Sequence, residues 1–211
     1  MTAEERWQYI ELRWHLSIVG AIRDALTQAP IVGARVDVAS GPGDFERKRK
    51  ILSQDPAWTQ QTVRMDRTVS QADGIFKFVK LPPGDYQLAV TAPPPSSRYV
   101  VTWQDVRVAS TRDIDGRVQL DFPTIELKPT QIRGHIIDAT TRQGIGGATI
   151  QLRGGAESSV TDQEGKYLLS HLTARRPKLE VLAPKYQTVT RPIDLTEGIV
   201  ELDIELQLQM P

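Results

Sequence analysis

The chain has 211 residues, enough for one or two compact cores, and its 26 Lys and Arg balance its 26 Asp and Glu. A formal net charge of zero provides no long-range field for a polyanion, so we expect no nucleic-acid partner. No apolar stretch approaches the roughly 20 residues of a membrane span, so we expect no membrane insertion and no transmembrane segment. The sequence contains no cysteine, which excludes disulfides and thiolate chemistry.

Residues 1–14 are expected to form an N-terminal arm that opens with a short helix, because Thr2 and Glu5 have the spacing of a capping box. Acidic residues occur where a secretory signal would be basic and then apolar. We therefore expect the protein to be cytoplasmic, or exported without a signal peptide as part of a particle. Aromatic side chains on a thin amphipathic segment are typical interface anchors; in the alternative interpretation they fold back onto the first domain. The candidate partner-binding residues of the arm are Trp7, Tyr9, Ile10 and Trp14.

Two strands are predicted after the start of the arm. Apolar and polar residues alternate from Leu12 towards Asp24 and again from Ile31 to Val38. A period of two is typical of a β-strand with one buried face.

A helical insertion is predicted at about residues 40–62, with Asp44 as its N-cap and a stop at Asp55-Pro56. Its basic run suggests contacts to an acidic partner or to phosphate. A solvated helix face is the commoner explanation of such a run. The candidate partner-binding residues here are Arg47 and Arg49.

Residues 73–90 hold the clearest turn signals of the chain. Asp73-Gly74 is typical of a tight two-residue hairpin turn, and Pro83-Gly84 predicts a second turn. Together they predict a β meander of three strands. Its expected buried residues are Phe76, Phe78, Leu81, Tyr86, Leu88 and Val90.

Further strands are expected at Tyr99 to Val108, Val118 to Leu127 and Ile199 to Leu208. Ala92–Ser97 contains three consecutive prolines and is expected to be a loop at one end of the first sandwich, because proline donates no backbone hydrogen bond. Lys128-Pro129-Thr130 is the expected domain boundary.

Several blocks of the sequence recur. Gly20–Asp24 recurs as Gly134–Asp138, 114 residues later. Val69–Gly74 recurs as Val160–Gly165, 91 residues later, so the first copy carries 23 extra residues between Val38 and Val69. Such internal repetition predicts two copies of one β domain.

The repeated pattern resembles the carboxypeptidase regulatory-like domain of the transthyretin-like (prealbumin-like) β-sandwich group. It consists of Gly-x-Ile-x-Asp, Gly-Ala-x-Val-x-Val, Asp-x-x-Gly-x-Tyr/Phe and Leu-x-Pro-Gly-x-Tyr. The match covers nearly the whole chain beyond residue 15. Copy one departs from the family at Gln71, where Asp is usual, and copy two has Thr173–Pro177 in place of Pro-Gly-x-Tyr.

The resemblance implies an all-β fold of two tandem transthyretin-like antiparallel β-sandwiches, of Greek-key, Ig-like type. The short N-terminal helix or arm and the helical insertion in the first sandwich are additions to it. The expected divisions are an arm at 1–14, a first sandwich at 15–128 with the insertion at about 40–62, and a second sandwich at 129–211.

The sequence offers no catalytic set, so we expect no enzyme, no cofactor and no metal site. Hydrolytic zinc needs about three converging ligands, whereas the three histidines are scattered over the chain. Two enzyme groups share the resembled sandwich, but the chain lacks the His-x-His segment of intradiol dioxygenases and the Tyr-Arg-Gly-Ser tail of hydroxyisourate hydrolases. The aspartates beside turns are expected to bond the local backbone rather than calcium. They are Asp24, Asp73, Asp138 and Asp162.

We therefore expect a non-catalytic structural or adaptor protein that binds other protein subunits, including further copies of itself, in a larger assembly. Modules of the resembled family occur in phage-tail-like contractile particles, so a bacterial contractile injection system is the setting considered. The alternative is a carbohydrate or small-ligand binding module with Trp58 and Trp103 as its aromatic contacts. A dioxygenase- or hydrolase-like enzyme of the prealbumin-like group is a further alternative.

Overall fold

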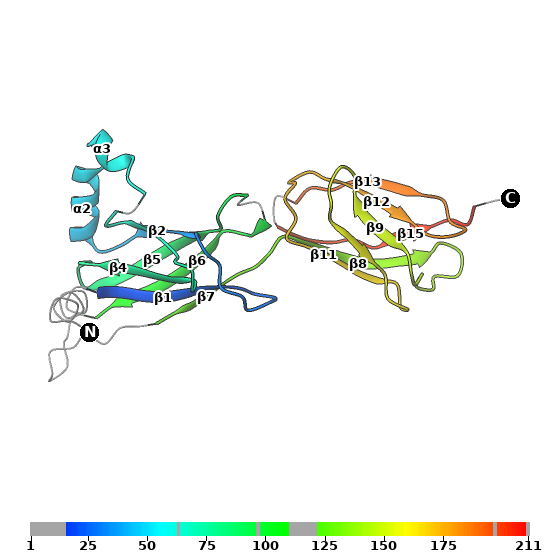
Figure 1. The fold of residues 1–211 in the computed structure, drawn as a ribbon, viewed down its shortest axis with the longest axis horizontal. Coiled ribbons are helices and arrows are strands. Elements are labelled where there is room, and N and C mark those ends of the chain that lie inside the picture. Colours follow the sequence, from blue (N-terminus) through cyan, green and yellow to red (C-terminus); the bar gives the residue numbers. More distant parts are fainter. Residues whose placement is uncertain (1–15, 63, 96–97, 110–121, 196–197, 210–211) are drawn as a thin grey trace. The chain divides into compact units, whose positions relative to one another are not determined.

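The computed structural model describes residues 16–62, 64–95, 98–109, 122–195 and 198–209 (Figure 1). The candidate arm residues Trp7, Tyr9, Ile10 and Trp14 therefore lie outside the described residues. The chain divides into two compact units. The first comprises the described residues up to Pro93 and those from Val101 to Lys128, and the second comprises the described residues from Pro94 to Val100 and from Pro129 onward.

The first domain is a sandwich of two β-sheets. One sheet has the strand order β4-β1-β7 and the other β3-β2-β5-β6. Apolar residues on the inner faces alternate with exposed residues, as the period of two predicts. The strands are β1 (Leu16–Asp24), β2 (Arg35–Ser40), β3 (Arg67–Val69), β4 (Ile75–Val79), β5 (Gly84–Thr91), β6 (Thr102–Val108) and β7 (Thr124–Leu127).

The second domain repeats this arrangement. Its sheets have the orders β11-β8-β14 and β10-β9-β12-β13, with β15 also paired to β8. Each strand from β8 to β14 thus takes the place of the strand seven positions earlier, so the predicted pair of all-β sandwich domains is confirmed. The strands are β8 (Gln131–Asp138), β9 (Thr149–Leu152), β10 (Ser158–Val160), β11 (Lys166–Ser170), β12 (Lys178–Leu182), β13 (Val189–Pro192), β14 (Ile199–Glu201) and β15 (Ile204–Leu206).

The meander predicted around Asp73-Gly74 is wrong. β3 and β4 belong to different sheets, so this turn crosses the sandwich, and the chain crosses back before β5. Gly74 is needed at the crossing because its φ is +77° and a Cβ would lie 2.6 Å from the Ile22 carbonyl oxygen. Gly165 meets the same two conditions in the second domain.

Parallel pairing forms one edge of the sheet that contains β1 and one edge of the equivalent sheet that contains β8. β7 pairs in parallel with β1, and β14 and β15 pair in parallel with β8. The segment from Ile199 to Leu208 was expected to be a single strand, but it forms two short strands, β14 and β15. Between them, the Leu202 carbonyl accepts a hydrogen bond from the Tyr167 hydroxyl at 2.8 Å.

Each sandwich has an apolar core of its own. The predicted buried row in residues 73–90 is confirmed, since each of its six members is at most 6% exposed. Full burial of such a side chain contributes about 1.5–3 kcal/mol. The corresponding members of the second core include Tyr167, Leu169, Leu172, Leu179 and Val181.

A buried hydroxyl joins the loop before β2 to the segment after β3. Ser70 donates to the Ile31 carbonyl at 2.6 Å and accepts a hydrogen bond from the Ala34 N–H at 2.9 Å. Thr161 makes the two corresponding bonds in the second domain at 2.6 and 2.8 Å. The duplication therefore extends to individual hydrogen bonds.

The helices α2 (Gly43–Leu52) and α3 (Pro56–Thr59) lie between β2 and β3, beside one end of the first sandwich (Figure 1). In the second domain, residues 153–157 alone join β9 to β10. The same sandwich thus forms without the helices. Asp44 lies inside the first turn of α2 rather than capping it, because the N-cap is Pro42.

The described residues from Pro94 to Val100 group with the second domain, although Pro94 and Pro95 were expected in a loop of the first. The Thr130 N–H donates to the Arg98 carbonyl at 2.8 Å. The Tyr99 ring packs edge-on against His171 at a centroid distance of 5.3 Å. The second domain therefore includes a segment that precedes β6 in the sequence.

Candidate binding groove on the helical insertion

Helix α2 is held on the first sandwich by one aromatic side chain and one arginine. Phe45 is fully buried and packs edge-on against Tyr86, with ring centroids 5.4 Å apart. Arg49 donates to the Val38 carbonyl at 2.6 Å and to the Glu46 carboxylate at 2.6 Å. These contacts fix both the position and the rotation of the helix.

Tyr86 supports this anchor from the core side. Its hydroxyl donates to the Pro82 carbonyl at 2.7 Å. Burial raises the pKa of Tyr86, and the nearby Glu46 carboxylate raises it further. The phenol therefore stays neutral and remains a hydrogen-bond donor at physiological pH.

The segment after α3 folds back to form the opposite wall of the insertion. Arg64 donates to the Asp66 carboxylate at 2.9 Å, and both side chains are only 9% exposed. The Arg64 guanidinium also lies over the Trp58 ring, 4.2 Å from its centroid. The Arg64 guanidinium thus covers one face of the Trp58 ring.

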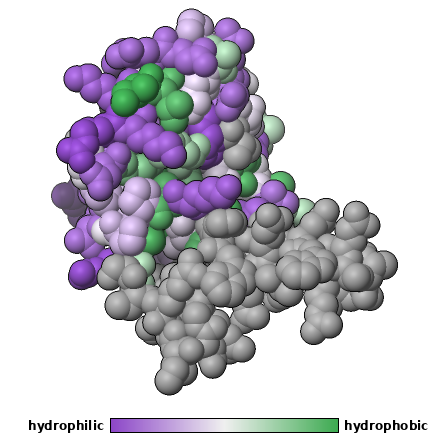
Figure 2. Space-filling model, turned by 90° about the vertical axis from the view of Figure 1, so that its left-hand side faces the viewer, coloured by the Kyte–Doolittle hydropathy of each residue, from purple (hydrophilic) through white to green (hydrophobic). Residues whose placement is uncertain are grey.

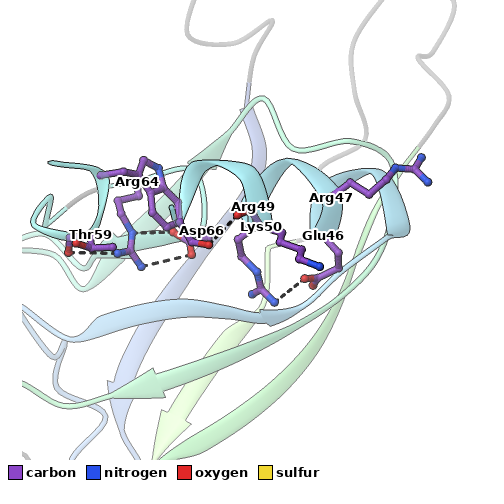
Figure 3. A pocket seen from close by; sticks show the side chains of 9 residues that line it. Glu46, Arg47, Arg49, Lys50, Thr59, Arg64 and Asp66 are labelled. Carbon is purple, nitrogen blue, oxygen red and sulfur yellow. Dashed lines mark hydrogen bonds and ion pairs between the residues drawn. The ribbon is translucent and has the colours of Figure 1, made fainter. Parts of the chain in front are cut away.

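A groove of about 690 Å³ opens between α2, α3 and this wall (Figure 3). Figure 3 shows the guanidinium groups of Arg49 and Arg64 turned towards their carboxylate partners, while Arg47 extends away from them. Four cationic side chains and two carboxylates line the groove, so its charge favours an acidic group. The lining residues are Glu46, Arg47, Arg49, Lys50, Ser53, Trp58, Thr59, Arg64 and Asp66.

The outer surface of α2 combines basic side chains with one exposed aliphatic side chain. Arg47 is 77% exposed and pairs with Asp44. Among the described residues, neither Lys48 nor Lys50 has a carboxylate partner. Ile51 is 71% exposed, and Figure 2 shows that the surface at this end of the molecule is mainly hydrophilic, with a small hydrophobic patch.

The structure brings together three of the candidate residues. Arg47, Arg49 and Trp58 line the same groove, although Arg49 and Trp58 also hold its walls in place. Trp103 lies elsewhere, on the edge strand β6, where it is 58% exposed.

Sequence reasoning missed four charged residues of the groove, namely Glu46, Lys50, Arg64 and Asp66. The only signal for the wall was the opposite charge of Arg64 and Asp66 two residues apart, a spacing at which strand side chains share a face.

The aspartates beside the turns bond the backbone, as predicted. An Asp24 oxygen accepts hydrogen bonds from the N–H groups of Leu26 and Thr27, both at 2.8 Å. Asp138 repeats this with the N–H groups of Thr140 and Thr141. In the part of the chain that the structure describes, no cluster of three or more His, Asp or Glu has a geometry that could hold a metal ion.

The sequence profile of the carboxypeptidase regulatory-like domain matches residues 17–120 and 131–208. The chain belongs to this family. The two matched segments coincide with the two sandwiches, so a carboxypeptidase regulatory-like domain is present twice. A search of curated proteins gave no significant match.

Solved structures show likenesses at low identity. The shaft pilin SpaA from Lactobacillus rhamnosus GG is 11% identical with a TM-score of 0.37, and the match covers 93% of this chain and 99% of the pilin. The Bacillus anthracis TIE protein is 15% identical with a TM-score of 0.37, covering 92% of this chain and 34% of that one. A chain of a cohesin–X-dockerin complex from Acetivibrio cellulolyticus is 22% identical with a TM-score of 0.33, covering 36% of this chain and 56% of that one. This chain thus spans about a third to just over half of the length of the last two.

None of the helices among the described residues combines the length and the apolar character needed to cross a bilayer.

Proposed function

We propose that the protein is a non-catalytic structural or adaptor subunit that binds another protein through its helical insertion. The observation that carries the proposal is the difference between the two domains. The second domain joins β9 to β10 with residues 153–157, whereas the first inserts two helices at the same place. An element that the sandwich does not require, yet which is anchored by the fully buried Phe45, is suited to a binding role.

The outer surface of α2 fits an acidic partner surface with an apolar spot. Arg47, Lys48 and Lys50 supply the charge, and the exposed Ile51 supplies apolar area next to it. Arg49 positions the helix rather than reaching outward, because its guanidinium is bonded to Val38 and Glu46.

Charge reversal on α2 tests the proposal. The tagged full chain and its Arg47→Glu/Lys48→Glu/Lys50→Glu variant are compared for recovery of co-purifying proteins, identified by mass spectrometry. The partner is then purified and the binding reconstituted. We expect about a tenfold or greater loss of affinity, because opposite-charge contacts become like-charge contacts.

A matched control makes the same change in charge on the second domain. Arg153, Arg175 and Lys185 are exposed and have no carboxylate partner among the described residues, so Arg153→Glu/Arg175→Glu/Lys185→Glu should keep the partner. Equal loss in both variants, or retention in both, contradicts the proposal. The expected setting in a phage-tail-like contractile particle stays a prediction, tested by whether the recovered partner is a particle protein.

The groove itself supports a second candidate function, the binding of a carbohydrate or small polar ligand. Trp58 lines it together with carboxylate, hydroxyl and guanidinium groups, a combination suited to a hydroxyl-rich ligand. A glycan array separates the candidates, because binding that is lost in Trp58→Ala and kept in Lys48→Glu, a change on α2 outside the groove lining, favours the ligand module.

A further inference from the structure

β6 is the least protected sheet edge in the described part of the chain. It has seven residues and pairs along its whole length with β5, from Gly84 opposite Val108 to Val90 opposite Thr102. No strand among the described residues pairs with its other side. In an antiparallel ladder, alternate residues point their N–H and C=O groups away from the neighbour, so between Trp103 and Val108 this side offers backbone groups without a partner among the described residues.

The second domain shows how the same edge is protected. β13 occupies the position of β6 there, but it has only four residues and ends in Pro192. Proline and shortness are the usual means of preventing an edge from pairing with another chain. β6 contains neither proline nor glycine. The two copies therefore differ in whether this edge is open.

The side chains of β6 alternate between the core and the outside. Val106 and Val108 are buried, while Trp103, Asp105 and Arg107 are exposed on the outer face. A shallow groove of about 490 Å³ lies over this face, and Asp105 and Arg107 are among its lining residues.

Within the described part of the chain, Arg107 and Asp105 make only weak polar contacts. Arg107 lies 3.6 Å from Asp85, with both side chains about 80% exposed (79% and 82%). Asp105 accepts a hydrogen bond from Gln87 at 3.1 Å. Exposed pairs of this kind contribute about 0–1 kcal/mol, so they are readily exchanged for partners on another chain.

The charges of β6 are self-complementary in one antiparallel register. With a twofold axis at Val106, Asp105 of each copy lies directly opposite Arg107 of the other, and Val106 lies opposite itself. An axis at Asp105 would oppose two carboxylates, and an axis at Arg107 would oppose two guanidinium groups. Directly opposite pairs favour unlike charges and disfavour like charges, which selects the axis at Val106.

We propose that β6 is a homodimer edge, which pairs with β6 of a second copy of this chain about an axis at Val106. The contact is isologous, so one Asp105–Arg107 pair forms on each side of the axis. The sheet β3-β2-β5-β6 then continues across the axis into the partner copy, and the backbone groups of both edges become satisfied. The partner here is a second copy of the chain, whereas the partner proposed for α2 is a different protein. The β6 contact uses none of the residues of α2.

Sedimentation of the full chain over a range of concentrations tests the proposal. We expect the wild type to sediment with twice the mass of the chain. Asp105→Arg and Arg107→Asp each replace two attractive pairs by two repulsive ones, and we expect each to raise the dimer dissociation constant about tenfold or more. The double variant Asp105→Arg/Arg107→Asp restores opposite charges and should return to within about threefold of the wild type.

Glu205→Arg is the matched control, because it reverses an exposed carboxylate paired with Arg142 in the second domain. It should leave the dissociation constant unchanged. Circular dichroism should show that each variant is folded, because the substituted positions are exposed. A monomeric wild type at all concentrations, single variants that retain the wild-type mass, or a double variant that stays monomeric would each overturn the proposal.

Discussion

The hydroxyl of Thr161 is bonded on both sides within the second sandwich. It donates to the Ile145 carbonyl and accepts from the Ala148 N–H, and the side chain is only 5% exposed. Thr161→Val keeps the shape and leaves two buried backbone groups without a partner. We expect a loss of about 1–3 kcal/mol in the free energy of unfolding, measured by urea denaturation.

Thr190→Val is the control for this substitution, because Thr190 is exposed on β13. Its unfolding midpoint should match that of the wild type. A Thr161→Val protein as stable as the control would show that the hydroxyl does not hold the loop to the strand.

Asp138 makes the stability of the second domain depend on pH. The Thr141 N–H, the Tyr186 hydroxyl and the Thr140 N–H donate to its carboxylate and hold its pKa below the usual range, although partial burial opposes this. A carboxyl group in the unfolded chain titrates at about pH 3.9. Because the folded pKa is lower, the stabilisation is fully present above that pH and is lost as the pH falls through the folded value.

Asp138→Asn should therefore make the free energy of unfolding less dependent on pH in the acidic range. The amide oxygen still accepts hydrogen bonds, but no proton is taken up as the pH falls. Urea midpoints measured from pH 6 to pH 2.5 should decrease less for the variant than for the wild type, and Tyr186→Phe should lie between them. An equal decrease of the urea midpoint with falling pH in the wild type and in Asp138→Asn would contradict the role of this carboxylate.

At the scale of elements, Phe45 attaches α2 to the sandwich. Phe45→Ala creates a cavity beside Tyr86, and buried Phe→Ala changes cost about 3–5 kcal/mol. We expect α2 to detach locally while the sandwich still unfolds cooperatively, because the second domain has the same sandwich without helices. Tryptic cleavage at the basic run Arg47–Lys50 should become at least about tenfold faster.

Ile51→Ala provides the comparison, since Ile51 lies on the same helix and is 71% exposed. Its cleavage rate should stay close to that of the wild type. Unchanged cleavage in Phe45→Ala would mean that the arginine contacts alone hold the helix.

Strand positions and burial were predictable because alternation reports which side chains face a core. The sheet to which a strand belongs was not. Asp73-Gly74 specifies a local backbone conformation, whereas the partners of β3 and β4 are chosen by contacts with strands distant in the sequence. The same limit explains why the parallel pairing of β7 with β1 was missed.

The groove was predictable only in part, for a related reason. Arg47 and Arg49 look alike in a basic run, yet Arg49 is bonded to the Val38 carbonyl and only Arg47 points outward. Arg64 and Asp66 form the buried wall through a fold-back that no local pattern encodes.

At the scale of the whole molecule, a duplicated fold separates what the sandwich needs from what has been added. Gly74 and Gly165, Ser70 and Thr161, and the turn aspartates recur in both copies, so they belong to the architecture. The insertion occurs in one copy only, which is the reason for assigning it to binding.

Replacing residues 39–66 by the sequence of residues 153–157 tests this separation most directly. The Val38 N–H donates to the Asp66 carbonyl, and Leu152 makes the corresponding bond to Glu157, so the short link can close the same ladder. The shortened chain should fold with an unfolding transition of each domain preserved and should no longer recover the partner of the full chain. A shortened chain that fails to fold, or that still recovers the partner, would contradict the account.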